Sequence, residues 1–262
     1  MPEPYWTAER ATLYGGDAVL GVLSSLTSQS ADAVVTDPPY SSGGAFRSDR
    51  AADPTMKYVP SKEVVNFHPS FSGDNRDQRS YAYWSALWLA ECLRIAKPGA
   101  PICVFSDWRQ LPLISDAMQI AGWVWRGVVV WDKTAGIRPN AGKFRQQAEF
   151  VLWGSSGPMP MDLHAPCLNG VFTHPPFRDK EHIAGKPYKL MRDLMQICPE
   201  GGTVLDPFMG SGTTGMAAIN TGRSFVGVEI DPHYQGNARK RIEAALVGYR
   251  DDGQQLPLAA NL

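Results

Sequence analysis

The sequence of 262 residues has few cysteines and no long apolar run. The four cysteines, Cys92, Cys103, Cys167 and Cys198, are widely spaced and form no CxxC pair, so neither a disulfide framework nor a zinc ribbon is indicated. No apolar stretch approaches the ~20 residues that a membrane span needs, and the first ten residues lack the pattern of a signal peptide. We therefore expect a cytoplasmic protein with no membrane partner.

The sequence also has almost no excess of charge of either sign. Its formal net charge is −1, which argues against a protein that coats nucleic acid, although a local basic face would be invisible in that sum. In residues 126–145 the bases outnumber Asp132, the one acid of this stretch; they are Arg126, Lys133, Arg138, Lys143 and Arg145. This segment is predicted to contact phosphates, and an ordinary solvated face is the alternative.

Hydrophobic residues make up 44% of the chain, enough for one folded α/β domain spanning residues 1–262. Short apolar segments at residues 31–36, 101–105, 203–206 and 223–229 alternate with segments of helical spacing. This alternation predicts a doubly wound, mostly parallel sheet. Two further apolar segments, WVWRGVVVW and AEFVLW, are predicted to be strands and antiparallel neighbours.

Two stretches have no sustained periodicity. Residues 41–80 are rich in Gly, Ser and Asp, and a connection of this length predicts a mobile functional loop. Residues 154–185 are rich in Pro and His and are predicted to form a small substrate-recognition insertion. The potential metal ligands of this region, His164, Cys167, His174 and His182, match no zinc spacing, so we expect no metal.

A glycine-rich turn near the carboxyl terminus has the layout of a nucleotide-binding βαβ unit. The segment TVLDPFMGSGTTG predicts a strand, a turn and a helix start, and the next strand ends in Glu229. Gly210, Gly212 and Gly215 allow a ligand to approach the backbone, and Glu229 is placed to accept hydrogen bonds from ribose hydroxyls.

The same glycines leave a different class of enzyme open. Residues 210–215 satisfy GxGxxG, which is also found in dinucleotide-dependent dehydrogenases. A P-loop does not fit, because no GK[ST] follows the glycines.

The second motif is Asp37-Pro38-Pro39-Tyr40, which follows a predicted strand. Because the carboxyl ends of parallel strands share one edge, we expect this loop and the glycine loop to meet in one cleft. An exocyclic base amine is a poor nucleophile, since its lone pair is delocalised into the ring. The Asp37 carboxylate and the Pro38 carbonyl, held by flanking prolines, could accept both amine hydrogens and localise that lone pair. The Tyr40 ring could stack on an extruded base.

Together with YGGD at 14–17, GVEIDPHY at 227–234 and HIAGKPYKLM at 182–191, these two motifs make the chain resemble a known family. It resembles the DNA amino-methyltransferases of the permuted beta class, in which the catalytic loop precedes the cofactor glycine loop. The resemblance covers nearly the whole chain and implies a seven-stranded, Rossmann-like methyltransferase sheet.

The resemblance also implies the reaction, its partners and its site. It implies methyl transfer from S-adenosyl-L-methionine to a flipped base in double-stranded DNA, and a homodimer, since dimers are frequent among relatives. The implied catalytic residues are Asp37, Pro38, Pro39 and Tyr40. The implied cofactor-binding residues are Asp17, Ala18, Asp37, Lys186, Asp206, Phe208, Gly210, Ser211, Gly212, Thr213, Glu229 and Ile230. Among these, Asp17 and Ala18 would lie near the cofactor adenine, Glu229 on the ribose, and Lys186 and Thr213 on the methionine carboxylate.

The chain departs from the family pattern in two places. Only about thirty residues separate AEFVLW from HIAGKP, near the size of a minimal supersecondary unit, so sequence specificity is expected to be shared with the 41–80 loop. The family commonly has His-Pro-x-x-Lys-Pro where this chain has HIAGKP at 182–187, so Lys186 keeps its match to the family motif more fully than His182 does.

Adenine N6 is the favoured target, because a loop that begins with aspartate leans towards adenine in this family, whereas serine is commoner in cytosine-N4 enzymes. Cytosine N4 is the first alternative. Enzymes that methylate protein glutamine usually have a loop that begins with Asn and the unpermuted motif order, and both differences count against that activity here. A dehydrogenase would leave DPPY unused, and a noncatalytic DNA-binding module would have no need of an intact Asp37 and Tyr40.

Overall fold

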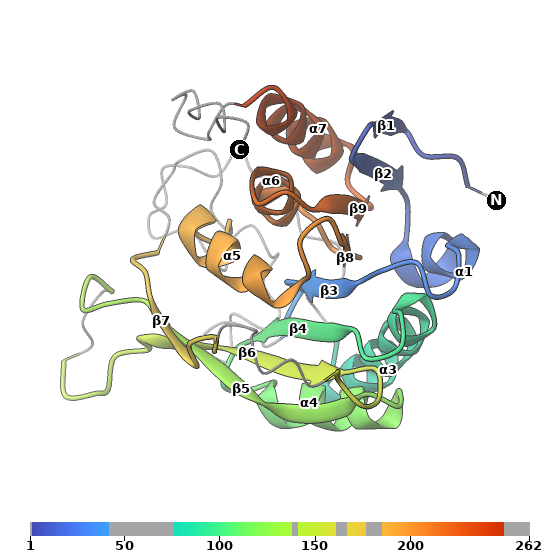
Figure 1. The fold of residues 1–262 in the computed structure, drawn as a ribbon. Helices are drawn as coiled ribbons and strands as arrows, with labels where there is room; N and C mark the ends of the chain where they lie inside the picture. The colour runs from blue at the N-terminus through green and yellow to red at the C-terminus, as the bar shows by residue number, and fades with distance from the viewer. Residues whose placement is uncertain (1, 42–75, 138–140, 161–166, 177–184, 249–262) are drawn as a thin grey trace.

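The computed structural model describes residues 2–41, 76–137, 141–160, 167–176 and 185–248, and their strands form one mixed sheet (Figure 1). In order across this nine-stranded sheet, the strands are β1 (Trp6–Ala8), β2 (Ala11–Gly15), β9 (Ser224–Glu229), β8 (Thr203–Asp206), β3 (Ala33–Thr36), β4 (Pro101–Ser106), β6 (Ala148–Ser155), β5 (Val124–Asp132) and β7 (Val171–Thr173). Pairing is parallel except where β1 meets β2 and where β6 meets β4 and β5. The predicted mostly parallel sheet, with β5 and β6 as antiparallel neighbours, is confirmed.

Helices cover both faces of the sheet, as a doubly wound fold requires (Figure 1). One face carries η1 (Ala18–Val22), α1 (Leu23–Ser25), α3 (Gln78–Ile95) and α4 (Leu111–Ile120). The other face carries α5 (Tyr188–Leu194) with η3 (Met195–Ile197), α6 (Thr213–Asn220) and α7 (Pro232–Leu246).

The two faces have separate hydrophobic cores because successive strand residues point to opposite sides. In β3, Ala33 and Val35 belong to the core under α5 to α7, whereas Val34 belongs to the core under α3 and α4. All three are fully buried. Strands covered on both faces are expected to be mostly apolar, which is why the AVV at residues 33–35 is recognisable as part of a strand from sequence.

The strand count differs from the seven expected from the resemblance. Two of the nine strands, β1 and β7, are three-residue edge strands. Segments this short carry no period-two signal, so neither was expected from sequence. The seven strands between them match the count that the resemblance implies; six lie at the predicted apolar segments, and β2 was not predicted from its own residues.

The boundaries of the irregular stretches also change. Helix α3 begins at Gln78, because Asp77 caps it by accepting hydrogen bonds from the backbone N–H groups of Arg79 and Ser80. Residues 42–75 of the predicted mobile loop lie outside the described residues. In the predicted insertion, β6 continues to Ser155 and β7 adds to the edge at β5, while residues 161–166 and 177–184 are not described.

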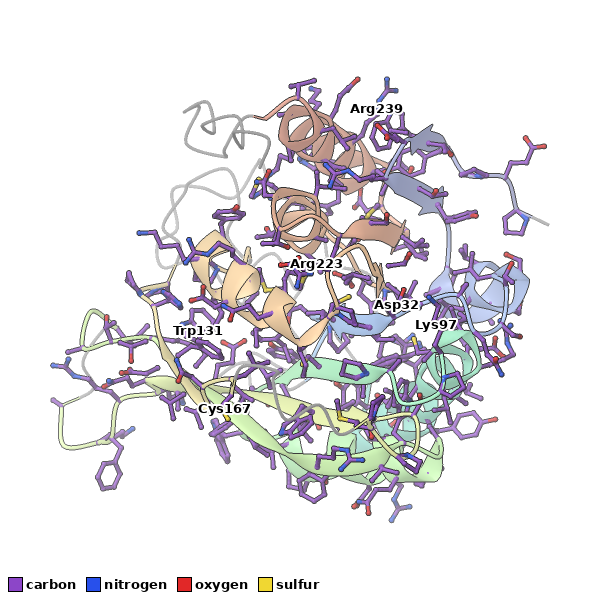
Figure 2. All side chains as sticks on the ribbon, viewed as in Figure 1. Asp32, Lys97, Trp131, Cys167, Arg223 and Arg239 are labelled. Carbon is purple, nitrogen blue, oxygen red and sulfur yellow. The ribbon has the colours of Figure 1, made fainter. Side chains whose placement is uncertain are left out.

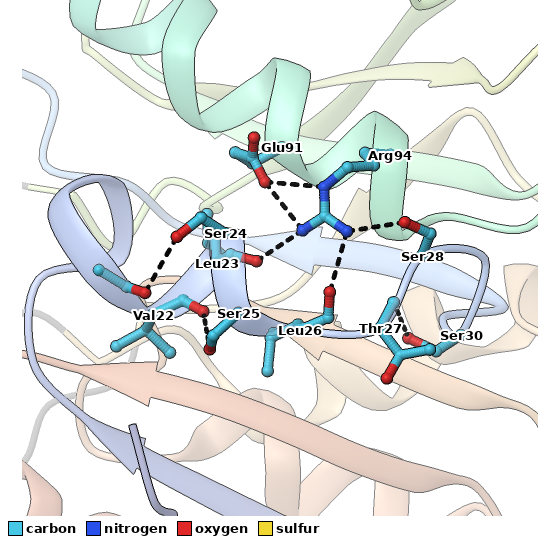
Figure 3. A network of polar contacts seen from close by, with 11 residues as sticks. Val22, Leu23, Ser24, Ser25, Leu26, Thr27, Ser28, Ser30, Glu91 and Arg94 are labelled. Atoms are coloured by element: carbon cyan, nitrogen blue, oxygen red, sulfur yellow. Dashed lines mark hydrogen bonds and ion pairs between the residues drawn. The ribbon is translucent and has the colours of Figure 1, made fainter. Parts of the chain in front are cut away.

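Polar contacts join α3 to α1 and join the residues that precede β3 to the start of β8. The Arg94 guanidinium of α3 donates to the carbonyls of Leu23 and Leu26, to the Ser28 hydroxyl and to Glu91 (Figure 3). Asp32, just before β3, contacts Lys97 Nζ at 2.7 Å and accepts from the Thr203 N–H at 2.9 Å (Figure 2). The contact between Asp32 and Thr203 holds the starts of β3 and β8 together.

The described residues contain no helix that is both long and apolar enough to cross a membrane. All four cysteines lie in the described ranges, and each is a free thiol.

Candidate active site at the carboxyl edge of the sheet

The two sequence motifs lie side by side at the carboxyl edge of β3 and β8. These strands are neighbours, and the chain continues from β3 to β4 in one direction and from β8 to β9 in the other. Such a reversal of strand order leaves a crevice in which α/β proteins commonly bind ligands. The Thr36 hydroxyl at the end of β3 donates to Asp206 Oδ1 at the end of β8, over 2.7 Å. The expected juxtaposition of the two loops is therefore observed.

The Asp37-Pro38-Pro39-Tyr40 loop is held by an ionic cluster. Lys186 Nζ lies 2.9 Å from Asp37 Oδ2, and it donates to the Tyr40 hydroxyl oxygen at 3.0 Å. The Tyr40 hydroxyl in turn lies 2.7 Å from Asp37 Oδ1 and 2.6 Å from Glu149 Oε1. Its single proton can serve only one of these two carboxylates at a time. The cluster thus brings together residues from β3, β6 and the start of α5.

Glu149 lies in the middle of this cluster, although it was identified from sequence only as part of the predicted strand AEFVLW and not as a site residue. Its Oε1 is 2.7 Å from Lys186 Nζ, its Oε2 is 2.6 Å from Lys133 Nζ, and the residue is 7% exposed. Because β6 is antiparallel to β4, the first residues of β6 lie at the carboxyl edge of the parallel strands. A lone acid at the start of an apolar strand that was expected to be antiparallel is the signal that could have identified it.

Burial and charge act against each other in this cluster. Burial raises the pKa of Asp37, while the Lys186 ammonium lowers it, and the net pKa is above its ordinary value. Burial would also raise the pKa of Glu149, but the ammonium groups of Lys186 and Lys133 outweigh it and hold this pKa at about 2. The Tyr40 pKa is well above its ordinary value, through burial and the two carboxylates, so Tyr40 is a neutral hydrogen-bond donor.

The glycine-rich residues 210–215 form the end of the connection from β8 and the first residues of α6. Gly212 caps α6 in the left-handed conformation, with φ +82°, and a Cβ there would lie 2.9 Å from Ala238 Cα. A Cβ on Gly215 would meet Ile242 Cδ1 at 2.6 Å, so these two glycines allow α6 to pack against α7. Gly210, with φ +51°, differs because a Cβ there would have no neighbour within 4 Å. Of the three, Gly210 is the one with open space for a ligand.

Glu229, at the end of β9, faces this loop. Its Oε2 accepts from the Gly210 N–H and its Oε1 from the Asp231 N–H, each at 2.9 Å. Burial raises its pKa, although these backbone donors lower it. Each carboxylate oxygen can accept a second hydrogen bond. An acceptor carboxylate beside an open glycine fits a ligand that carries hydroxyl groups, such as a ribose.

The remaining predicted cofactor residues occupy the same edge, with different partners. Asp17 caps η1 by accepting from the N–H groups of Val19 and Leu20, and Ala18 is buried. Ile230 is 45% exposed. Phe208 packs against Trp84 in a tilted arrangement and against Trp88 edge to face, with ring centroids 5.3 and 5.2 Å away.

Lys186 and Thr213 contact different groups of residues. Lys186 belongs to the cluster around Asp37, whereas the Thr213 hydroxyl and Ser211 accept hydrogen bonds from Arg241. The two residues expected to share one carboxylate therefore have separate partners in this structure.

Asp206 is expected to make stability depend on pH. Burial raises its pKa to about 7, against the hydrogen bonds from Thr214, Thr36 and the Phe208 N–H, which lower it. An unfolded aspartate titrates near ~3.9. Between these values the folded state keeps a proton that the unfolded state releases, so Asp206 makes the free energy of unfolding fall as pH rises from about 4 to about 7.

Substitution with asparagine removes this titration. Urea unfolding of the wild-type protein and the Asp206→Asn variant between pH 4.5 and 7.5 should give a stability difference, wild type minus variant, that decreases as pH rises. Parallel curves would show that Asp206 has an ordinary pKa.

Two of the four potential metal ligands named above, Cys167 and His174, are described, and His164 and His182 lie outside the described residues. His174 Nε2 lies 2.9 Å from Asp193 Oδ2. Within the described ranges, no three His, Cys, Asp or Glu residues are grouped as a metal site would require.

Comparisons with known proteins agree with the geometry. The family model described as DNA methylase matches residues 31–160 and 165–240. The type II methyltransferase M2.DpnII of Streptococcus pneumoniae is 26% identical over 263 residues, covering 93% of this chain and 94% of its own.

Solved structures share the fold. The M1.HpyAVI–SAM complex has a TM-score of 0.64 at 23% identity, covering 88% of this chain and 98% of its own. The PvuII DNA methyltransferase, described as cytosine-N4-specific, has a TM-score of 0.66 at 16% identity, covering 99% of each chain. The resemblance to S-adenosylmethionine-dependent DNA amino-methyltransferases is confirmed. Since the family model matches more than half of its residues, this chain belongs to the DNA methylase family.

Proposed function

We propose that the protein methylates N6 of adenine in double-stranded DNA, with S-adenosylmethionine as the methyl donor. The observation that carries the choice of adenine is the aspartate at position 37. In the resemblance described above, a loop that begins with aspartate leans towards adenine. Asp37 lies beside the glycine loop, because β3 and β8 are neighbours.

The reaction needs the target amine to become a better nucleophile. The cofactor supplies an electrophilic methyl group on a sulfonium. The Asp37 carboxylate and the Pro38 carbonyl would accept hydrogen bonds from the two N–H groups of the amine, which favours localisation of the nitrogen lone pair. The Lys186 ammonium, 2.9 Å from Asp37 Oδ2, favours the ionised acceptor form of Asp37.

A base inside a duplex cannot reach this loop, so the target base would be flipped out of the helix. The Tyr40 ring would then stack on the extruded base. Base–aromatic stacking of this kind contributes ~1–3 kcal/mol per base.

The cofactor would lie along the carboxyl ends of β2, β9 and β8. Glu229 would accept hydrogen bonds from the ribose, Gly210 would leave room for the ligand, and Asp17 and Ala18 would flank the adenine ring. Helix α6 begins at Thr213, and the amino terminus of a helix favours an anionic group such as the methionine carboxylate of the cofactor. We assign Lys186 chiefly to the catalytic loop, because its described contacts are Asp37, Tyr40 and Glu149.

The hairpin between β5 and β6 is the proposed phosphate-binding segment. Residues 133–148 contain four bases and no acid, and Lys143 and Arg145 are exposed. The connection leaves β5 at Lys133 and enters β6 one residue before Glu149, so both of its ends lie at the catalytic cluster.

Reversing one charge on this hairpin should weaken DNA binding. Lys143→Glu is expected to raise the dissociation constant for duplex DNA by about 10-fold at 50 mM salt and to reduce the salt dependence of binding. Fluorescence anisotropy with a labelled duplex at several salt concentrations measures both. Lys240→Glu, an exposed lysine of α7, is the matched control and should behave as the wild type. Equal effects of the two substitutions would remove the hairpin from the interface.

The choice between adenine and cytosine can be tested in cells. The protein would be expressed in a bacterial host that lacks DNA methylation, and the digested genomic DNA analysed by nucleoside mass spectrometry. N6-methyladenine supports the proposal. N4-methylcytosine would keep the mechanism and overturn the base, an outcome that the fold likeness to a cytosine-N4 enzyme makes worth testing.

A further inference from the structure

Glu149 connects the two lysines of the catalytic cluster, and none of the recognised motifs includes it. We propose that Glu149 is a positioning residue for methyl transfer: it holds Lys186 and accepts the hydrogen bond of the Tyr40 hydroxyl, so that Asp37 becomes free to receive the base amine. The inference rests on the proposed function of Asp37 as the acceptor for that amine.

The first step of the argument is the occupancy of Asp37. Its Oδ1 lies within hydrogen-bond distance of the Tyr40 hydroxyl, and its Oδ2 contacts the Lys186 ammonium. Each oxygen can accept a second hydrogen bond, but an incoming amine would then share Asp37 with two donors that already draw on its negative charge. Those donors can leave Asp37 cheaply only if a second acceptor is within reach, because an unpaired buried donor is costly.

Glu149 is that second acceptor. Its Oε1 lies 2.6 Å from the Tyr40 hydroxyl and 2.7 Å from Lys186 Nζ. Both donors that engage Asp37 can thus shift their hydrogen bonds to Glu149 with little movement. The side chain of Lys186 is 12% exposed and that of Glu149 is 9% exposed, so water cannot readily replace either partner.

Lys133 fixes Glu149 from the opposite side. It lies 2.6 Å from Oε2, which leaves Oε1 directed at Tyr40 and Lys186. The two lysines hold the Glu149 pKa at about 2, so the acceptor is ionised at every pH at which the enzyme could work. Two carboxylates and two ammonium groups make the cluster neutral overall. Removal of Glu149 would leave Asp37 as the one described carboxylate that pairs with Lys186.

The test is Glu149→Gln, assayed as total methyl label transferred to DNA so that the result does not depend on which base is modified. We expect kcat to fall by about 10-fold, because Lys186 and Tyr40 then remain on Asp37. The dissociation constant for S-adenosylmethionine should stay within about threefold, which also shows that the variant is folded. Glu243→Gln on the surface of α7 is the matched control and should leave kcat unchanged.

A pH profile separates positioning from a merely structural role. The charged and titratable groups that face Asp37 are Lys186, Glu149, Tyr40 and Asp206. Removing the Glu149 charge favours ionised Asp37, so the acid limb of the kcat profile should move to lower pH, by about 1 unit. Glu149→Asp, which restores the charge, should return the limb towards that of the wild type.

Each outcome is decisive. An unchanged kcat and an unmoved acid limb in Glu149→Gln would overturn the inference, as would an Asp variant whose acid limb stays with that of the Gln variant. If the wild type transfers no methyl group to DNA, the proposed function fails instead. If the wild type methylates cytosine, the inference is still tested by the same assay.

Discussion

Replacement of Asp37 with alanine should lower kcat for methyl transfer to DNA by about 10²–10³-fold, the loss typical of removing one preorganised polar group from a transition state. Asp37 is the proposed acceptor for the amine hydrogen, and no other carboxylate of the described residues occupies its place in the loop. The fold should survive, because Lys186 and Tyr40 keep their contacts with Glu149. Single-turnover transfer of a labelled methyl group to a duplex measures the effect.

The dissociation constant for S-adenosylmethionine should stay within about threefold in Asp37→Ala, as expected for a group that acts on the target amine. Asp116→Ala, an exposed aspartate of α4, serves as the control and should match the wild type. An Asp37→Ala enzyme that retains most of its kcat would remove Asp37 from the reaction.

Glu229→Ala should show the opposite pattern. Hydrogen bonds to a charged group contribute ~1.5–3 kcal/mol, so the dissociation constant for S-adenosylmethionine should rise by about 10–100-fold. The substitution also releases the N–H groups of Gly210 and Asp231, which Glu229 now holds. At saturating cofactor, kcat should change little. Isothermal titration calorimetry gives the affinity. The dissociation constant of Glu229→Gln, which keeps one neutral acceptor, should lie between those of the wild type and Glu229→Ala.

The two substitutions are informative as a pair. Asp37→Ala and Glu229→Ala assign the chemistry and the cofactor to different strands, β3 and β9. If both weakened the cofactor equally, with equal effects on kcat, the division of roles between the two loops would be wrong.

Much of the fold was predictable because its strands have the patterns that burial imposes. β3, β4 and β8 are covered by helices on both faces, so they are buried along nearly their whole length and mostly apolar, with polar residues chiefly at their ends. The edge strands β1 and β7 were not predicted, since three residues carry no measurable period. Likewise, helix α3 starts earlier than its apolar spacing indicates, because an aspartate cap rather than an apolar residue sets its first turn.

The candidate site was predictable where its residues follow parallel strands. Asp37 and Glu229 each come at the end of such a strand, so their shared edge follows from the fold class. Glu149 escaped because it stands at the beginning of an antiparallel strand, and only the pairing of β6 with β4 brings it to that edge. Gly212 and Gly215 were expected to let a ligand approach the backbone, and the structure adds a second role, because Ala238 and Ile242 of α7 occupy the space that a Cβ would fill. Helix packing of this kind is set by tertiary structure and leaves no local signal.

The most direct test of the central claim is methyl transfer by the purified protein. The wild type and Asp37→Ala would be incubated with methyl-labelled S-adenosylmethionine and unmethylated duplex DNA, and the digested nucleosides separated by mass spectrometry. We predict labelled N6-methyladenine from the wild type and almost none from the variant. Measurable binding of S-adenosylmethionine with no label in any DNA base would contradict the assignment of DNA as the substrate.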